Sequence, residues 1–492
     1  MTAAQYGRIS PPPLKRRKRE SPNRTTPSDS TNPSSTSILQ KPNRGTGIRI
    51  VAWNINGIQP FVQGYLQKTL HSFFQSSITA RSRKRQHSPG DSQIDGKFPG
   101  DPSKESRPSL RDALRRQHWP EVLLLQEIKI KPGDEKTMSA VRVAANDGSS
   151  LEGGPASMQK LPNHVSSGRP PLGTLLADGG PRYEVHFVLP SDPHNARGFG
   201  GKVYGVCAIL RQDFMQDVVS CIREPPLDRE GRVQIIETHA LDVSVPTNIG
   251  SSSSSSEHKP STVGKDDSRG PLKLAIINIY AVNGTFNPYH STHTGAVIGT
   301  RHDRKLAMHT ELLQEAHRLE SRGFSVVIAG DLNIARERID GYPNLRTSPH
   351  QHVLNRADFN QKFFASKVLP PDSSSVVAAR YRMNELPGKK DGNLAEAQGF
   401  TADVKGLKAI DTFRYIHGNL RKYSWHSRTK EWGTCCDRVD LIVASRSLGH
   451  SIIGADICDH PRDRGPSDHC PIWVDIGRGA VVGDTQRPSD HP

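Results

Sequence analysis

Ten short apolar runs, rich in β-branched residues, follow one another along the chain and constrain its fold more than any other feature. They occupy Ile48–Trp53, Val122–Leu125, Tyr183–Leu189, Val203–Leu210, Val233–His239, Leu272–Tyr280, Phe324–Ala329, Val439–Val443, Ser451–Ile457 and Pro471–Ile476. Each run has the length and composition of a β-strand. Ten strands suit two sheets far better than one, so the sequence predicts two sheets.

The clearest helical pattern spans Arg304–Arg322 and ends before Gly323, a residue that commonly follows a helix. Its apolar stripe, with one histidine, has the helical period and consists of Leu306, His309, Leu312, Leu313, Ala316 and Leu319. Strands mixed with only a few helices predict either an α+β fold or a two-sheet sandwich flanked by helices.

Composition indicates that much of the chain lies outside the core. Only 34% of the 492 residues are hydrophobic and 6% are aromatic, too few to fill this length with packed domains. The polar, low-complexity segments are residues 1–46, 76–107, 144–180, 245–270, 370–398 and 478–492. We expect them to be disordered tails and long insertions, which surface loops tolerate because closure entropy grows slowly with length. One domain over residues 47–477 remains.

Several classes of protein are excluded by what the sequence lacks. No run of 18 apolar residues is present, so we expect no membrane span, and the N-terminus has no apolar signal segment. The six cysteines form no CxxC pair, which argues against a zinc ribbon and against a disulfide framework. We expect a soluble, intracellular monomer.

The net charge of +16 is concentrated in two low-complexity stretches. Residues 1–47 carry nine Lys/Arg against two Asp/Glu, and residues 75–118 carry ten against five. Within the first stretch, Lys15–Arg19 (KRRKR) is a basic run of the nuclear-localisation type, so we expect a nuclear protein. A solvated charge cluster is the alternative interpretation, and a mitochondrial pool stays open.

Polar residues with metal-binding and acid–base chemistry follow or precede several of the predicted strands. They are Asn54, Asn56, Glu127, Tyr280, Asp331, Asn333, Asp440, Asp468 and His469. Any one of them is weak evidence, because Asn, Asp and Gly are ordinary turn residues. Together, oxygen donors suit a hard cation such as Mg²⁺, and a carboxylate beside a histidine suits acid–base work on a phosphate ester.

The motifs WNINGI, LLLQEIK, AGDLNIARERID, DRVD and PSDHCPI occur in this order between Ile48 and Ile476. They resemble the endonuclease/exonuclease/phosphatase superfamily, and within it the apurinic/apyrimidinic (AP) endonucleases related to exonuclease III. The resemblance implies an α/β fold, a four-layer sandwich of two β-sheets flanked by helices, with the site at one edge between the sheets.

The resemblance also implies a role for each polar residue. Glu127 would be the principal Mg²⁺ ligand, with Mn²⁺ as an alternative ion, and Asp331 would orient or deprotonate the attacking water. The implied metal set is Asn54, Asn56, Glu127, Asp331, Asn333, Asp468 and His469. Asn333 would stabilise the phosphorane, and Tyr280 and the His469–Asp440 pair would contact the phosphate.

The implied activity is Mg²⁺-dependent DNA repair on double-stranded DNA. The enzyme would cleave the phosphodiester 5′ to an abasic site and would also act on blocked 3′ ends as a 3′–5′ exonuclease or 3′-phosphodiesterase. One alternative is another phosphodiesterase of the superfamily. The other is a catalytically weakened, clamp-recruited DNA-binding protein, because fold alone does not fix function.

Two departures from the family pattern bear on the site. Val282 stands where relatives usually have proline, and Asp437 stands before Arg438 where many have Trp or Ser. The second position lies near the pocket that accepts a base-less sugar in relatives, so an acidic residue there would retune substrate binding. Trp425 and Trp432 are candidates for stacking on the substrate or for simple packing.

A further pattern is Gln67–Phe74 (QKTLHSFF), which fits the box that binds the sliding clamp PCNA. Gln67, Leu70, Phe73 and Phe74 would contact the clamp through a short helical plug. The alternative is that these residues form the buried face of a helix that follows the first strand.

Overall fold

A computed structural model describes residues 47–66, 108–148, 175–196, 204–226, 228–241, 271–365 and 406–477, which belong to one compact unit. The predicted tails, the basic run Lys15–Arg19, most of each predicted insertion and the clamp box Gln67–Phe74 lie outside these residues. Those predictions stay predictions. None of the described helices has the length and apolarity needed to cross a membrane.

Two six-stranded mixed sheets form the centre of the domain, and each of the ten predicted runs contains one of their strands. The first sheet has the order β16 (Ile452–Ile457), β17 (Ile472–Gly477), β1 (Gly47–Asn54), β2 (Val122–Gln126), β4 (Val206–Arg211) and β3 (Tyr183–Val188). The second has the order β12 (Ile410–Asp411), β15 (Asp440–Ala444), β10 (Ser325–Asp331), β7 (Leu274–Tyr280), β6 (Val233–Thr238) and β5 (Val219–Arg223). The prediction of two sheets is confirmed.

Alternation of side chains along the strands builds three apolar layers. In β1, Ile50 and Ala52 enter the layer between the sheets, whereas Val51 and Trp53 face the opposite side. In β10, Val327 likewise packs between the sheets while its neighbours Val326 and Ile328 face outward. Because each sheet buries both faces, helices must cover the two outer ones.

Four helices supply the outer layers of a four-layer sandwich: α2 (Leu110–Arg116), α3 (Glu135–Ala145), α5 (Arg301–Ser321) and α6 (Gln351–Phe364). The short helices α4 (Gln212–Asp217) and α8 (Thr412–His417) each place a phenylalanine in the layer between the sheets, and α9 (Pro461–Arg464) has no buried residue. Residues of α2 and α3 pack on the outer face of the first sheet, and residues of α5 and α6 pack on that of the second. The predicted α/β sandwich flanked by helices is therefore confirmed.

The predicted helix Arg304–Arg322 corresponds to α5, which begins three residues earlier. Thr300 accepts a hydrogen bond from the Asp303 amide, and Asp303 accepts one from the Thr300 amide, so the two form a capping box. This local cap starts the helix before its apolar stripe begins.

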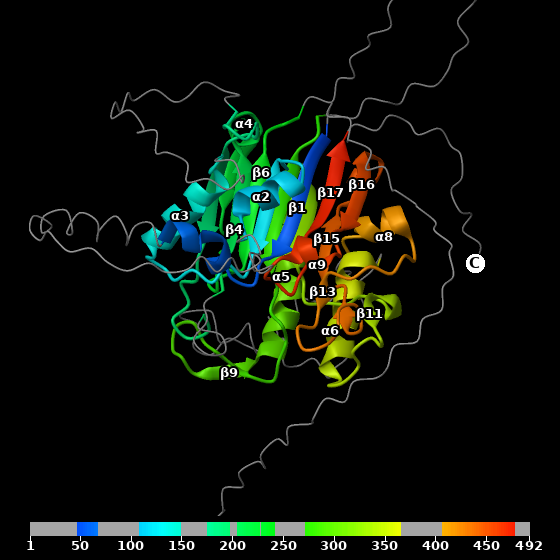
Figure 1. The fold of residues 1–492 in the computed structure, drawn as a ribbon. Helices are drawn as coiled ribbons and strands as arrows, with labels where there is room; N and C mark the ends of the chain where they lie inside the picture. The colour runs from blue at the N-terminus through cyan, green and yellow to red at the C-terminus, as the bar shows by residue number, and fades with distance from the viewer. Residues whose placement is uncertain are drawn as a thin grey trace, which may run out of the picture. The chain divides into compact units, whose positions relative to one another are not determined.

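Several short elements complete the domain and were not predicted. They are β8 (Pro288–His290), β9 (Val297–Thr300), β11 (Gly341–Tyr342), β13 (Trp425–His426), β14 (Cys436–Asp437) and the 3₁₀ turns η2 (Arg338–Asp340) and η5 (Arg446–Ser451). Strands β11, β14 and β13 form a small sheet of their own. Figure 1 shows β13 and β11 close to α6, below the larger sheets.

The sheet registers bring the strand ends with polar residues to one place. Strand β1 runs parallel to β2, with Asn54 opposite Gln126, and β7 runs parallel to β10, with Tyr280 opposite Asp331. Strand β17 pairs with β1 in the first sheet, although the two strands lie at opposite ends of the domain sequence (Figure 1). The carboxyl ends of four strands therefore meet at one edge of the sandwich.

Candidate active site

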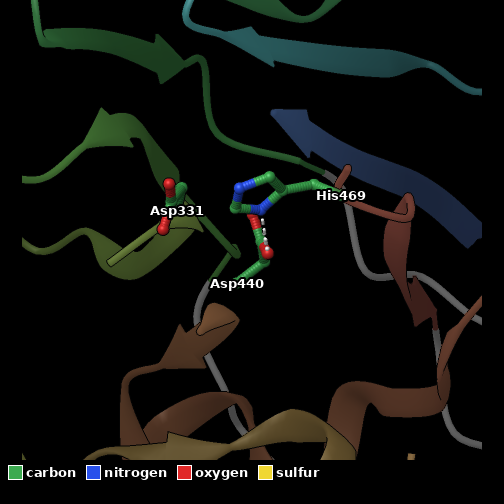
Figure 2. Close-up of side chains that lie close together, drawn as sticks. All are labelled: Asp331, Asp440 and His469. Carbon is green, nitrogen blue, oxygen red and sulfur yellow. Dashed lines mark hydrogen bonds and ion pairs between the residues drawn. The ribbon is translucent and has the colours of Figure 1, made fainter. Parts of the chain in front are cut away.

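A cavity of about 490 Å³ opens at this edge, and eight of the nine predicted site residues line it. These are Asn54, Asn56, Glu127, Tyr280, Asp331, Asn333, Asp468 and His469. The ninth, Asp440, lies behind His469, as Figure 2 shows. The structure thus brings together every polar residue that the strand-end pattern singled out.

His469 is held by Asp440 through a buried hydrogen bond. Its Nδ1 lies 2.8 Å from Asp440 Oδ2, and Figure 2 shows the other ring nitrogen on the side of Asp331. Ser424 Oγ accepts hydrogen bonds from the Asp440 and Val439 amides, which fixes the start of β15. Trp53 Nε1 donates to the His469 carbonyl at 3.0 Å, so both members of the pair have rigid supports.

Burial and charge set the protonation of this pair. Burial disfavours the imidazolium, but the charge of Asp440 and its hydrogen bond outweigh burial and raise the pKa of His469 to about 10. Burial, followed by the charge of Asp440, raises the pKa of Asp331 to about 7. At neutral pH the site therefore offers a cationic imidazole beside a carboxyl whose pKa is raised by burial and by its acidic neighbour.

Asp331 stands at the end of β10, where a glycine allows two strands to approach closely. A Cβ at Gly330 would lie 2.1 Å from the Ile279 carbonyl oxygen, and its φ of +143° also favours glycine. Asp331 accepts hydrogen bonds from Asn54 Nδ2 at 2.9 Å and from the Asn333 amide at 2.8 Å. These donors orient the carboxylate toward the cavity.

Asn333 has a left-handed backbone conformation that hydrogen bonds from neighbouring residues hold in place. Its φ is +52°, and its side-chain amide donates to the Ala281 carbonyl at 2.9 Å. The buried Lys305 Nζ donates to the carbonyls of Val282 and Asn333, both at 2.9 Å. One side chain on α5 thereby ties together the loops that follow β7 and β10, and an outlier backbone persists at this functional position.

A cluster of oxygen donors lies on the other wall of the cavity. Glu127, at φ +55°, is reached by Asn54 Nδ2 at 3.2 Å and by Lys129 Nζ at 3.0 Å. Asn56 Nδ2 donates to Asp468 Oδ1 at 2.5 Å. Carboxylate and amide oxygens of this kind are the ligands that hard divalent cations prefer.

The structure contains a second indication that a cation fits here. Asp440 Oδ1 is buried and has no hydrogen-bond partner among the described residues. Ligand atoms of Asp331, Asp440 and His469 all lie within 4.8 Å of one another. A hard ion prefers carboxylate and amide oxygens to an imidazole nitrogen, so the oxygen atoms around Glu127 and Asp331 fit such an ion best.

Tyr280 lines the cavity at the end of β7. Arg232 lies over its ring at 4.8 Å and over the ring of Tyr204 at 4.0 Å. Burial, together with the negative charge of Glu127, raises the pKa of Tyr280 well above its usual range. The phenol therefore stays protonated and can donate a hydrogen bond into the cavity.

The family departures and the two tryptophans also have defined places. Val282 is buried and uses its carbonyl to bind Lys305. Asp437 is buried and pairs with Arg346 at 3.0 Å, so its charge is compensated. Trp425 lines the cavity and donates to Asp468 Oδ2 at 3.1 Å, whereas Trp432 stacks on His426 at 3.7 Å.

Two site residues escaped the strand-end pattern because neither follows a predicted strand. Lys305 precedes the predicted stripe of α5 by one residue and stands four residues before His309, so a lysine on the buried face was its signal. Arg346 lies in a polar loop, and its contact with Asp437 depends on tertiary structure. No local pattern marks it.

A two-sheet α/β sandwich whose sheet edge carries carboxylates, amides and a charged imidazole defines a class of hydrolase for phosphate esters. Within that class, the sequence profile of the Endonuclease/Exonuclease/phosphatase family matches residues 51–491, and the chain belongs to this family. It is an enzyme whose family hydrolyses phosphoester bonds with the help of a divalent metal ion.

Individual relatives are more distant. A DNA-(apurinic or apyrimidinic site) endonuclease 2 from Saccharomyces cerevisiae is 26% identical over 182 residues. That match spans 34% of this chain and only about a third, 31%, of the yeast protein.

Solved structures that match the chain share still less sequence. The catalytic domain of APE2 from Xenopus laevis is 16% identical, covers 88% of this chain and 94% of its own, and has a TM-score of 0.42. An AP endonuclease from Archaeoglobus fulgidus is 14% identical, covers 87% of this chain and 98% of its own, and has a TM-score of 0.40.

Proposed function

We propose that this protein is a Mg²⁺-dependent DNA-repair nuclease that hydrolyses the phosphodiester 5′ to abasic sites in double-stranded DNA. Exonuclease activity from 3′ ends and removal of 3′ blocking groups accompany this activity. The observation that carries the proposal is the convergence of His469–Asp440, Asp331 and Glu127 in one cavity between the sheets. The name of the yeast relative supports the choice of substrate.

Glu127 is the principal residue proposed to hold Mg²⁺, with the side-chain oxygens of Asn54, Asn56 and Asp468 near it. When bound, the ion supplies positive charge to the phosphate oxygens and to the leaving group. Lys129, which pairs with Glu127 at 3.0 Å, is the cation that the metal ion would displace from that carboxylate.

The chain's own residues carry the proton transfers. Asp331 accepts the proton of the attacking water, and a metal ion held by Glu127 would favour the ionised form of this carboxyl. Protonated His469 donates a hydrogen bond to an oxygen of the attacked phosphate, and Asp440 stabilises its charge. Asn333 and Tyr280 add donors for the negative charge that develops on the phosphate oxygens.

Cleavage of a labelled duplex with one abasic-site analogue tests this proposal. Wild-type protein with Mg²⁺ should incise 5′ to the lesion, and EDTA should abolish the reaction. Asp331→Ala should lower turnover by about 100-fold or more, because a group that handles charge in the transition state is lost. Full activity of Asp331→Ala would contradict the assigned base.

The same assay separates the alternatives. Resection of a recessed or phosphate-blocked 3′ end without internal incision would identify an end-processing enzyme. Turnover of poly(A) or inositol phosphates instead of DNA would identify another phosphodiesterase of the family. Metal binding without any turnover would favour a binding protein.

Nuclear localisation and clamp recruitment belong to the proposal and rest on residues outside the described ranges. Replacing Lys15–Arg19 with alanines should move a fluorescent fusion out of the nucleus. Phe73→Ala/Phe74→Ala should abolish capture of the protein on immobilised PCNA. If the variants still enter the nucleus and still bind PCNA, the assigned localisation signal and clamp box are wrong, and the nuclease proposal is unaffected.

A further inference from the structure

A half-exposed arginine stands at the wall of the catalytic cavity, in the loop between β11 and α6. The side chain of Arg346 is 51% exposed, and its Nη2 lies 3.0 Å from Oδ2 of the buried Asp437. Its guanidinium carbon lies 5.0 Å from the centre of the Trp425 ring. No hydrogen bond joins this guanidinium to the described residues, and the residue lines the cavity, so its donors are available to a ligand.

The loop that carries Arg346 is tied to the catalytic loop by a second arginine. Arg356 on α6 donates from Nη2 to the Arg346 carbonyl and from Nε to the Ala335 carbonyl, both at 2.7 Å. Ala335 follows Asn333 by two residues. The loop also packs tightly on β11, because a Cβ at Gly341 would lie 2.7 Å from Leu345 Cα. Arg346 is therefore held at a defined place relative to Asn333.

Trp425 connects Arg346 to the reacting centre. Its ring contacts the Arg346 guanidinium on one side of the small sheet, and its indole N–H donates to Asp468 at 3.1 Å. Trp425 also forms a β-bridge with His469 and pairs with Asp437 in the register of β13 and β14. The Trp425 side chain thus connects the Arg346 guanidinium to Asp468, which also lines the catalytic cavity.

The chemistry of this wall suits an anion better than a neutral sugar. An arginine fork presents planar donors that match phosphate oxygens, and Asp437 occupies only one of them. A further cationic group, Arg356, also lines the cavity, and Asp437 is the carboxylate that pairs with Arg346. The nearest anions in a nucleic acid are the phosphates adjacent to the one under attack.

We propose that Arg346, anchored by Asp437 and Trp425, binds a phosphate of the substrate strand next to the phosphate that is hydrolysed. This subsite rests on the proposed function. It makes binding of the substrate strand at this wall depend on the negative charge of that phosphate. Asp437 acts as a positioning residue, because its carboxylate holds the guanidinium without touching the substrate.

The subsite is tested by removing the negative charge of the DNA phosphate and the positive charge of Arg346, separately and together. Duplexes carrying one uncharged methylphosphonate at each linkage flanking the cleaved bond are compared with the all-phosphate duplex. Arg346→Met should lower kcat/KM roughly 10-fold on the all-phosphate duplex, mostly through KM, as expected for a charged hydrogen bond. On the duplex whose neutral linkage lies at the subsite, the same substitution should have no further effect.

Matched variants separate this contact from general effects. Arg115→Met removes the same charge from the exposed surface of α2, outside the cavity, and should leave kcat/KM unchanged. Asp437→Asn should weaken the same linkage-specific effect, and it should add nothing to Arg346→Met. An equal melting temperature for Arg346→Met and wild type would show that the fold is intact.

Two results would overturn the subsite while leaving the nuclease proposal in place. One is a loss in Arg346→Met that has the same size on every methylphosphonate duplex. The other is an Asp437→Asn loss that persists fully in the Arg346→Met background. If wild type cleaves no DNA, the proposed function fails, and equilibrium binding of the same duplexes in EDTA then decides the subsite by the same comparison.

Discussion

At the residue scale, the hydrogen bond between His469 and Asp440 sets the charge of the imidazole. Asp440→Asn removes the carboxylate that stabilises the imidazolium, so the pKa of His469 should fall from about 10 toward or below its ordinary value. We expect kcat to drop by about 100-fold or more with little change in KM. NMR titration of the imidazole together with steady-state kinetics measures both effects. Asp475→Asn, which breaks a pair with Arg49 outside the cavity, is the control.

Glu127 makes a separate prediction about the metal. Glu127→Gln keeps the shape of the side chain but removes its charge, so the affinity for Mg²⁺ or Mn²⁺ should fall at least about 10-fold. Isothermal titration calorimetry measures this without any turnover. Glu184→Gln on β3, outside the cavity, should bind the ion as wild type does. Unchanged affinity in Glu127→Gln would place the ion elsewhere.

The sequence predicted those site residues that lie within a local motif next to a predicted strand. Asp331 and His469 stand at strand ends within recognisable motifs, and the resemblance that these motifs carry implied a site at one edge between the sheets. Parallel pairing of β10 with β7 and antiparallel pairing of β17 with β1 bring the two residues to that edge. Arg346 and the role of Asp437 did not follow, because an ion pair across 91 residues has no local signature. The compensated charge of Asp437 also resolves how an acidic residue is accommodated at this wall.

At the element scale, α5 links the outer helical layer to the catalytic loops through Lys305. Only 1% of this residue is exposed, and its ammonium donates to carbonyls that follow β7 and β10. Lys305→Met keeps a similar volume but releases both loops, so we expect kcat to fall about 10-fold with KM less affected. Leu312→Ala on the same helix leaves a cavity in the core and should lower the melting temperature while kcat stays near wild type.

A buried ion network joins β12, the turn η2 and Arg438, which lies between β14 and β15, and it makes a prediction about pH. Asp411 pairs with Arg438 at 2.8 Å and with Arg336 at 2.6 Å. Although burial opposes ionisation, these arginines lower the pKa of Asp411 to about 2. The unfolded carboxyl titrates near 3.8. A carboxylate with a lowered folded pKa stabilises the fold above the unfolded value, and this contribution disappears as the pH falls toward 2.

Asp411→Asn isolates that contribution, because asparagine caps α8 as well as aspartate does. At pH 7 the variant should lose about 3 kcal/mol of unfolding free energy, since two buried arginines lose a counter-ion. In urea unfolding, the difference from wild type should narrow as the pH is lowered from 4 toward 2. A difference that is independent of pH would show that the charge of Asp411 is not what stabilises this region.

Strands were easier to predict than the small elements for a physical reason. Each strand of the main sheets, apart from β5 and the two-residue β12, has an apolar run long enough to be predicted as a strand. By contrast, β11, β13 and β14 have two residues each and exist because loops from distant parts of the chain pair with one another. Their position at the cavity shows that part of the site is built by tertiary pairing alone.

At the scale of the whole molecule, one sandwich is closed by strands from the two ends of the domain, and long segments leave and re-enter it at its surface. The connection between β6 and β7 is the clearest case. Leu241 and Leu272 exchange two backbone hydrogen bonds, of 2.8 and 3.2 Å, so the chain returns to the point at which it left the sheet. The fold therefore needs only a short turn between these residues.

Replacing residues 243–270 with a six-residue Gly/Ser linker tests this conclusion. Closing a shorter loop costs less entropy, so unfolding free energy should rise by about 1 kcal/mol, and kcat/KM on the abasic duplex should not change. A Gly/Ser linker of the original length is the control, and it should match wild type in both measurements. Loss of activity in both variants would mean that this segment's sequence takes part in the reaction. Loss of stability in both would mean that it packs on the sandwich, in which case the two sheets alone do not account for the stability of the domain.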